Sequence, residues 1–270
     1  MTQLDRKSFF HVALLCIGIL GSLCTTRAQA DDKTPVLLAL GDSITAGFNA
    51  KRFGDNRQYS WSTGLSLEES IINELSTYYQ KKFYGINLAT VGATSDTVLG
   101  QVGRLSSIKA DFATVLVGAN DLCRHLNDFD SYAEVYRENF TQILKTLIST
   151  NSDMKIFISK VPNLGNLYQT TKDIKSCRKK WEVLPVCRTY LRNSTEENRT
   201  RFDRNWEKLI KIQSEVAGAF NPKNVIFLDV DPGNFTVSDV STHDCFHPSI
   251  KGQSLLGSRS WTKIIESGAL

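Results

Sequence analysis

Five short apolar runs, separated by helix-like patterns, restrict the fold of this sequence more than any other feature. They cover residues 36–40, 86–89, 114–117, 155–159 and 225–229. Such runs are typical of strands that are buried on both faces, as in a parallel sheet. The helix-like patterns cover residues 67–83, 95–108, 132–150, 202–220 and 249–266. This alternation predicts a three-layer α/β/α domain around a five-stranded, mostly parallel sheet, with sites at the carboxyl ends of the strands.

The first thirty residues resemble a secretory signal. Arg6 and Lys7 precede an apolar run at 9–24, and Ala28-Gln29-Ala30 gives the small-x-small pattern that signal peptidase recognises. The run is short for a membrane span. We therefore expect cleavage after Ala30, a secreted or periplasmic product with no transmembrane segment, and a single domain over residues 31–270.

Charge and cysteine content restrict the partners and the compartment. Without its first thirty residues the chain keeps 29 basic and 27 acidic residues, which is no signature of a nucleic-acid partner. Four cysteines also remain, at 123, 177, 187 and 245, and an even number in an exported protein predicts two disulfides. Three pairings are possible. Cys177 and Cys187 are close in sequence and are expected to pair, which leaves Cys123 for Cys245.

Residues 162–201 interrupt the alternation, because they contain no clear strand or long helix. We expect an insertion here, at about 162–201, held by a disulfide. Its basic residues are Lys172, Lys175, Arg178, Lys179, Lys180, Arg188 and Arg192. They indicate either a solvated charged excursion or a cover over an active site that meets anionic or zwitterionic lipid surfaces.

Histidine is the base that nucleophilic catalysis by a serine requires. The exported chain has three candidates, His125, His243 and His247, and only His247 has an acid three residues before it, Asp244. A turn would bring these two side chains together, so that Asp244 holds one imidazole nitrogen while the other faces a serine. A polar surface turn would show the same pattern. A zinc site is disfavoured because the nearby candidate ligands share one short turn.

Three further residues follow the first three predicted strands. Ser43 ends the first, where a sharp turn would expose its hydroxyl and its backbone N–H. Gly92 and Asn120 follow the second and third, where a bare N–H and a side-chain amide would serve as donors to an oxyanion. Each alone has a simpler interpretation: a helix cap at Ser43, a strand end at Gly92 and a turn at Asn120.

Together these segments resemble the SGNH, or GDSL-type, hydrolases. The family's four blocks are found at residues 41–43, 92, 118–121 and 244–247. The resemblance implies a flavodoxin-like fold without a cofactor or metal. It also implies that Ser43 is the nucleophile and that Asp244 and His247 complete a triad. The N–H groups of Ser43 and Gly92 and the side chain of Asn120 would then form the oxyanion hole.

Three stretches, at residues 59–64, 118–123 and 244–249, are similar to the phospholipase B-like branch of that superfamily. This similarity implies an esterase that releases fatty acids from phospholipids or lysophospholipids, with its substrate presented at a membrane surface. Where that branch usually has Gly-His after the last block, this chain has Gly252-Gln253. A Cys123–Cys245 bond would tie the Asn120 loop to the loop of the acid and the base.

Two other functions fit the same residues. One is a short-chain or carbohydrate (acetyl) esterase with the same catalytic groups, because a family resemblance restricts chemistry more than substrate. The other is a non-catalytic surface or lipid-binding protein on a hydrolase scaffold. Four aromatic residues that follow Ser43 would line an acyl groove or belong to the core. They are Phe48, Phe53, Tyr59 and Trp61.

Overall fold

Five parallel strands form one sheet in the order β2-β1-β3-β4-β5. The strands are β1 (Val36–Gly41), β2 (Tyr84–Asn87), β3 (Phe112–Leu116), β4 (Lys155–Ser159) and β5 (Val225–Leu228). The direction of winding reverses between β1 and β3. In doubly wound sheets the crevice at the carboxyl ends of two such strands is the usual place for a ligand.

The computed structural model describes residues 33–105, 108–192, 194–230 and 235–270. The expected signal sequence and its cleavage after Ala30 lie outside these residues. Residues 34–270 form one compact unit. Within the described residues, we find no helix with the length and apolar character needed to cross a membrane.

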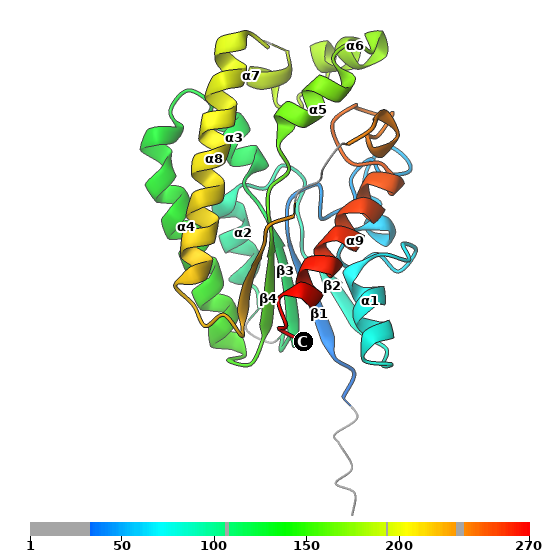
Figure 1. The fold of residues 1–270 in the computed structure, drawn as a ribbon, viewed down its shortest axis with the longest axis vertical. Helices are drawn as coiled ribbons and strands as arrows, with labels where there is room; N and C mark the ends of the chain where they lie inside the picture. The colour runs from blue at the N-terminus through cyan, green and yellow to red at the C-terminus, as the bar shows by residue number, and fades with distance from the viewer. Residues whose placement is uncertain (1–32, 106–107, 193, 231–234) are drawn as a thin grey trace, which may run out of the picture. The chain divides into compact units, whose positions relative to one another are not determined.

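Helices cover both faces of the sheet, as Figure 1 shows. On one face lie α1 (Ile71–Tyr78) and α9 (Ile250–Glu266), and on the other α2 (Ser95–Val102), α4 (Phe129–Thr150) and α8 (Glu196–Gly218). Shorter elements are α3 (Ala119–Arg124), α5 (Leu164–Thr171), α6 (Lys175–Val183), α7 (Arg188–Leu191) and the 3-10 turns η1 (Arg57–Tyr59) and η2 (Val237–Asp239). The predicted three-layer fold with a five-stranded parallel sheet is confirmed.

The three central strands are mostly apolar because both faces of the sheet are buried there. In β1, Leu37 packs with α1 and α9, while its neighbour Leu38 packs with the helices of the opposite face. Phe112 and Ala113 of β3 divide in the same way. Successive strand side chains point to opposite faces, so each residue contributes to one of two cores.

Several predicted boundaries move for identifiable reasons. The second strand lies at 84–87 and not at 86–89, because β2 is an edge strand whose residues are only partly buried. Helix α4 begins at the buried Phe129, three residues earlier than predicted, with Asp128 as its N-cap. Helix α8 begins at 196, six residues earlier than predicted, where the Thr195 side chain accepts the N–H of Asn198.

Residues 162–201, here called the insertion, are more regular than predicted. They contain α5, α6, α7 and the start of α8. Figure 1 shows α5, α6 and α7 at the end of the sheet where the strands terminate. These helices are too short to give a clear apolar periodicity in the sequence, and α6 is also strongly charged.

Two disulfides are present, as predicted, but the predicted pairing is wrong. Cys123 is bonded to Cys187 and Cys177 to Cys245, with Cα–Cα distances of 5.1 and 5.3 Å. The Cys177–Cys187 and Cys123–Cys245 bonds do not form, because Cys177 lies on α6 and Cys187 directly precedes α7. One half of the insertion is therefore bonded to helix α3 and the other to the loop before α9.

Hydrogen bonds reinforce both attachments. The Trp181 indole donates to the Cys245 carbonyl at 3.1 Å, and the Lys180 ammonium donates to the Thr242 carbonyl at 2.6 Å. On the other side the Thr189 hydroxyl donates to the Cys123 carbonyl at 2.8 Å. The insertion is thus anchored to the segments that contain Asn120 and His247, and at least one lysine of its basic run has a partner within the protein.

Non-reducing peptide mapping tests the pairing directly. We expect one disulfide-linked peptide containing Cys177 and Cys245 and another containing Cys123 and Cys187. Replacing Cys177 and Cys245 together by alanine opens a link between residues 68 apart in sequence. This should lower the free energy of unfolding by about 4 kcal/mol in urea titrations, since the unfolded chain gains entropy. A peptide joining Cys177 to Cys187 would contradict the structure.

Candidate active site

The turn after β1 places Ser43 at the carboxyl end of the sheet. Gly41 ends β1 with φ of +148°, and a Cβ at this position would collide with the Leu116 carbonyl oxygen of β3. Glycine is therefore needed for β1 to approach β3 this closely. Beyond it the Asp42 carboxyl accepts the N–H of Ile44 at 2.9 Å, which fixes the turn around Ser43.

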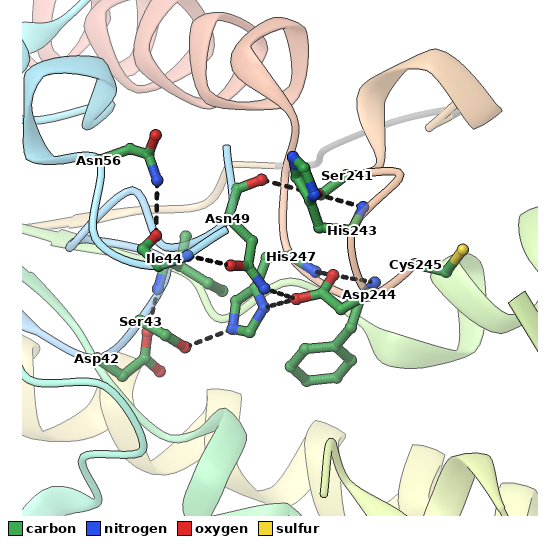
Figure 2. A network of polar contacts seen from close by, with 12 residues as sticks. Asp42, Ser43, Ile44, Asn49, Asn56, Ser241, His243, Asp244, Cys245 and His247 are labelled. Carbon is green, nitrogen blue, oxygen red and sulfur yellow. Dashed lines mark hydrogen bonds and ion pairs between the residues drawn. The ribbon is translucent and has the colours of Figure 1, made fainter. Parts of the chain in front are cut away.

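Ser43, His247 and Asp244 form one chain of hydrogen bonds (Figure 2). His247 Nε2 lies 2.7 Å from Ser43 Oγ, and His247 Nδ1 lies 2.5 Å from Asp244 Oδ2. The other oxygen, Asp244 Oδ1, accepts the N–H groups of Phe246 and His247 at 2.9 and 3.0 Å. The structure thus brings together the three residues proposed from the sequence for a nucleophile, its base and the acid that orients the base.

Hydrogen bonds stabilise the ionised form of Asp244. Burial alone would raise the pKa of this carboxyl. The hydrogen bond and charge of His247, the side-chain amide of Asn49 and the His247 backbone N–H outweigh burial and lower the pKa to about 2. Asp244 is therefore an anion throughout the neutral range, able to hold His247 in one orientation and to stabilise its protonated form.

The two other candidate histidines, His125 and His243, make different contacts. The ring of His125 stacks on Tyr132 with centroids 3.7 Å apart, and its Nδ1 faces Asp128. The Nε2 atom of His243 lies 3.1 Å from the Lys51 carbonyl. Among the residues that the structure describes, no cluster of three or more His, Cys, Asp or Glu side chains fits a metal ion.

Gly92 and Asn120 line the same pocket as Ser43 and His247, with a volume of about 240 Å³. Gly92 has φ of +75°, and the Arg124 guanidinium donates to its carbonyl at 2.9 Å. Asn120 Nδ2 donates to the Ala93 carbonyl at 3.0 Å, which fixes the plane of its amide. The structure thus gathers the three groups predicted to bind an oxyanion beside the nucleophile.

Asp121 connects the segments that carry Gly92 and Asn120. This buried carboxyl accepts the N–H and the hydroxyl of Ser95, at 3.0 and 2.8 Å, and the hydroxyl of Tyr132 at 2.8 Å. Because Ser95 begins α2 and Asp121 belongs to α3, these bonds hold the Gly92 loop against the helix that carries Asn120.

Three side-chain amides that sequence reasoning missed hold the loops of the site. Gln101 of α2 donates to the Gly41 carbonyl at 3.0 Å and accepts its N–H at 3.1 Å. Gln253 of α9 donates to the Ile44 carbonyl at 2.9 Å. The departure from Gly-His at 252–253 was the one sequence signal for Gln253. Asn49, the third amide, contacts Asp244 directly and gave no such signal.

The pocket is lined by apolar side chains from three segments. Phe48 and Phe53 follow the nucleophile, Val91 precedes Gly92, and Leu184 and Val186 come from the insertion. The four aromatic residues considered above therefore have different roles. Trp61 is fully buried in the core, and the Tyr59 hydroxyl accepts a hydrogen bond from Lys51.

Asp42 has a buried carboxyl and directly precedes Ser43. Burial raises the pKa of Asp42 to about 7, although the Ile44 N–H and the nearby His247 act in the opposite direction. This carboxyl is therefore partly protonated near neutral pH.

The family model described as GDSL-like Lipase/Acylhydrolase matches residues 37–260 of the chain. Among curated proteins, "Phospholipase B1, membrane-associated" of Homo sapiens is 24% identical over 290 residues, which cover 86% of this chain and 19% of that protein. The chain thus spans about a fifth of this relative.

Solved structures share the fold at low identity. Phospholipase A1 from Streptomyces albidoflavus NA297 superposes with a TM-score of 0.57 at 15% identity, covering 87% of this chain and all of the other. An extracellular lipase from Streptomyces rimosus gives 0.55 at 15% identity, again covering 87% and 100%.

Removing the nucleophile or the base tests the assignment of the site. Replacing Ser43 or His247 by alanine should lower kcat for p-nitrophenyl butyrate by a factor of at least about 10⁴, because each is needed to form an acyl-enzyme. His125→Ala is the matched control and should keep wild-type turnover. Equal turnover by Ser43→Ala and the wild type would contradict the assignment.

The Asp42 carboxyl should make stability depend on pH. Its pKa is raised from 3.8 to about 7 on folding, so it favours the folded state below pH 4 and loses this contribution as the pH rises through 7. Asp42→Asn removes the ionisation. The free energy of unfolding of this variant, minus that of the wild type, should therefore increase from pH 4 to pH 8 by an amount on the order of 4 kcal/mol.

Urea titrations at both pH values measure this difference. An exposed aspartate, Asp153→Asn, is the control and should follow the wild-type curve. Parallel pH curves for Asp42→Asn and the wild type would contradict the interpretation.

Proposed function

The chain belongs to the GDSL-like lipase/acylhydrolase family and is a serine hydrolase of ester bonds, and from this premise we propose that it is an exported phospholipase or lysophospholipase. One observation carries the proposal. The hydrogen-bonded chain of Ser43, His247 and Asp244 opens into a pocket whose lining is mostly apolar.

Acylation begins with proton transfer from Ser43 Oγ to His247 Nε2, across the 2.7 Å contact between them. The oxygen attacks the ester carbonyl carbon, and the carbonyl electron pair moves onto its oxygen. The N–H groups of Ser43 and Gly92 and the amide of Asn120 stabilise the resulting oxyanion. Asp244 stabilises the imidazolium during this step.

The intermediate then collapses. The carbon–oxygen bond to the alcohol breaks, and the leaving alkoxide takes the proton from His247. Water enters, loses a proton to His247 and attacks the acyl carbon. The fatty acid leaves, and Ser43 recovers its proton.

A lipid acyl chain suits the pocket because it can bury apolar area there. Phe53, which lines the pocket, is 70% exposed, and Val183, the last residue of α6, is exposed to the same extent. Exposed apolar side chains beside an apolar pocket are available to contact the acyl chain of a lipid. The name of the human relative, a membrane-associated phospholipase, supports a phospholipid substrate.

The basic residues of the insertion suit a lipid surface. Lys175, Arg178 and Lys179 of α6 are exposed, close in sequence to the apolar residues at 183–186. Cations beside an apolar rim attract a layer of phosphate head groups. We place the substrate at such a surface.

Export and domain organisation complete the proposal. Two disulfides are typical of proteins in oxidising compartments. Cleavage after Ala30 would release residues 31–270 as one domain with the insertion at 162–201, secreted or periplasmic.

Fatty-acid release from defined lipids tests the function. The protein should liberate palmitate from palmitoyl lysophosphatidylcholine or dipalmitoyl phosphatidylcholine, and Ser43→Ala should not. Along a series of p-nitrophenyl esters, kcat/KM should rise from acetate to longer chains because the pocket buries the added methylenes.

Phe53→Ser provides a matched variant at the mouth of the pocket. It should weaken hydrolysis of the long esters and leave hydrolysis of the acetate unchanged. A preference for acetyl esters, with no fatty acid released from either lipid, would instead identify a short-chain or carbohydrate esterase.

A further inference from the structure

Asn49 occupies a central position in the polar network of Figure 2. Its Nδ2 atom donates to Asp244 Oδ2 at 2.6 Å. The same oxygen lies 2.5 Å from Nδ1 of His247. Asn49 and His247 therefore share one carboxylate oxygen, and the Asn49 side chain is 1% exposed.

The orientation of the Asn49 amide is fixed by its other bonds. Its Oδ1 accepts the N–H of Gly54 at 2.7 Å, which leaves the NH₂ group facing Asp244. The backbone N–H of Asn49 donates to the Gly54 carbonyl at 2.8 Å, and its carbonyl accepts the Ser241 hydroxyl at 2.6 Å. Asn49 also has φ of +59°, a conformation that asparagine tolerates better than most residues.

We propose that Asn49 is a positioning residue for the catalytic pair, holding the shared oxygen of Asp244 in place and limiting how strongly that oxygen stabilises protonated His247. This rests on the proposed function, since the pair must cycle its proton during ester hydrolysis. Asn49 is one of the residues that line the pocket, and in this mechanism it acts through its bond to Asp244.

The shared oxygen of Asp244 determines how strongly the carboxylate acts on His247. An N–H donor stabilises negative charge on Asp244 whether or not His247 carries its second proton. An oxygen that already accepts this bond attracts the imidazolium less strongly than a bare carboxylate would. The amide therefore keeps the proton on His247 transferable to the leaving group, which general acid catalysis requires.

In the part of the chain that the structure describes, the side chain of Asn49 is bonded to Asp244 and Gly54 and to no other group beside His247. Asp42 on the β1 side and Asp244 in the same turn are the ionisable groups that act on its ring. The rings of Phe48 and Phe246 contact it edge-on and carry no charge. A change in the pH profile after substitution at Asn49 can thus be assigned to the shared oxygen.

Asn56 offers a matched control in the same loop. It accepts the N–H of Arg52 at 3.2 Å and donates to the carbonyls of Arg52 and Gly54 at 2.9 and 2.6 Å. None of these bonds reaches Asp244. Asn56→Ala should therefore loosen the loop without changing the shared oxygen.

The test compares three variants across pH with a soluble short-chain ester. Asn49→Gly, which suits a positive φ, should lower kcat/KM by about tenfold to a hundredfold. It should also move the acid limb of the kcat/KM profile to higher pH, because Asp244 then stabilises the imidazolium more strongly. Asn56→Ala should lower the urea midpoint and leave the acid limb at its wild-type pH.

Asn49→Asp keeps an acceptor for the Gly54 N–H and places a second carboxyl beside Asp244. It should displace the acid limb upward by about one pH unit or more. Wild-type acid limbs in both Asn49→Gly and Asn49→Asp would overturn the proposal. Activity losses that follow only the loss of folded protein, as in Asn56→Ala, would overturn it too.

NMR titration of the His247 ring gives the same comparison without substrate. The titration midpoint should move upward in the two Asn49 variants and not in Asn56→Ala. A failure of the proposed function would appear differently, as wild-type protein that hydrolyses none of the esters while its ring titration still responds to Asn49.

Discussion

The turn that carries Ser43 is buried, so its peptide groups need hydrogen-bond partners inside the protein. Gln101 serves both backbone groups of Gly41, and Gln253 serves the carbonyl of Ile44. These glutamines belong to α2 and α9, which cover opposite faces of the sheet. The position of Ser43 is therefore set by the same contacts that join the two helical layers, and a displacement of either helix would move it.

Features that depend on burial or on short sequence distance were predictable from the sequence. The apolar runs located the strands because a parallel sheet is covered on both faces, and β4 was placed to the residue. The side chains of Asp244 and His247 are in contact as expected, because the two residues are three positions apart in one turn. Ser43, Gly92 and Asn120 met because parallel strands all end at one edge of the sheet.

Features that depend on distant contacts were not predictable. Asn49 and Asp244 are 195 residues apart, and nothing around Asn49 in one sequence announces its partner. Helices α5 to α7 have four to nine residues each, too few for a periodic apolar pattern to emerge. The predicted disulfide pairing relied on closeness in sequence. In the structure, α6 and the turn after it place Cys177 and Cys187 beside different segments of the main fold.

The interleaved disulfides have a consequence for biogenesis. Cys177 and Cys187 are ten residues apart, whereas the native partners are separated by 64 and 68 residues. Closing a loop of 64 residues costs about 1.6 kcal/mol more chain entropy than closing a loop of ten. An oxidant acting on the unfolded chain therefore favours the Cys177–Cys187 bond, which blocks both native bonds. A molecule that forms this bond reaches the native pairing only through thiol–disulfide exchange.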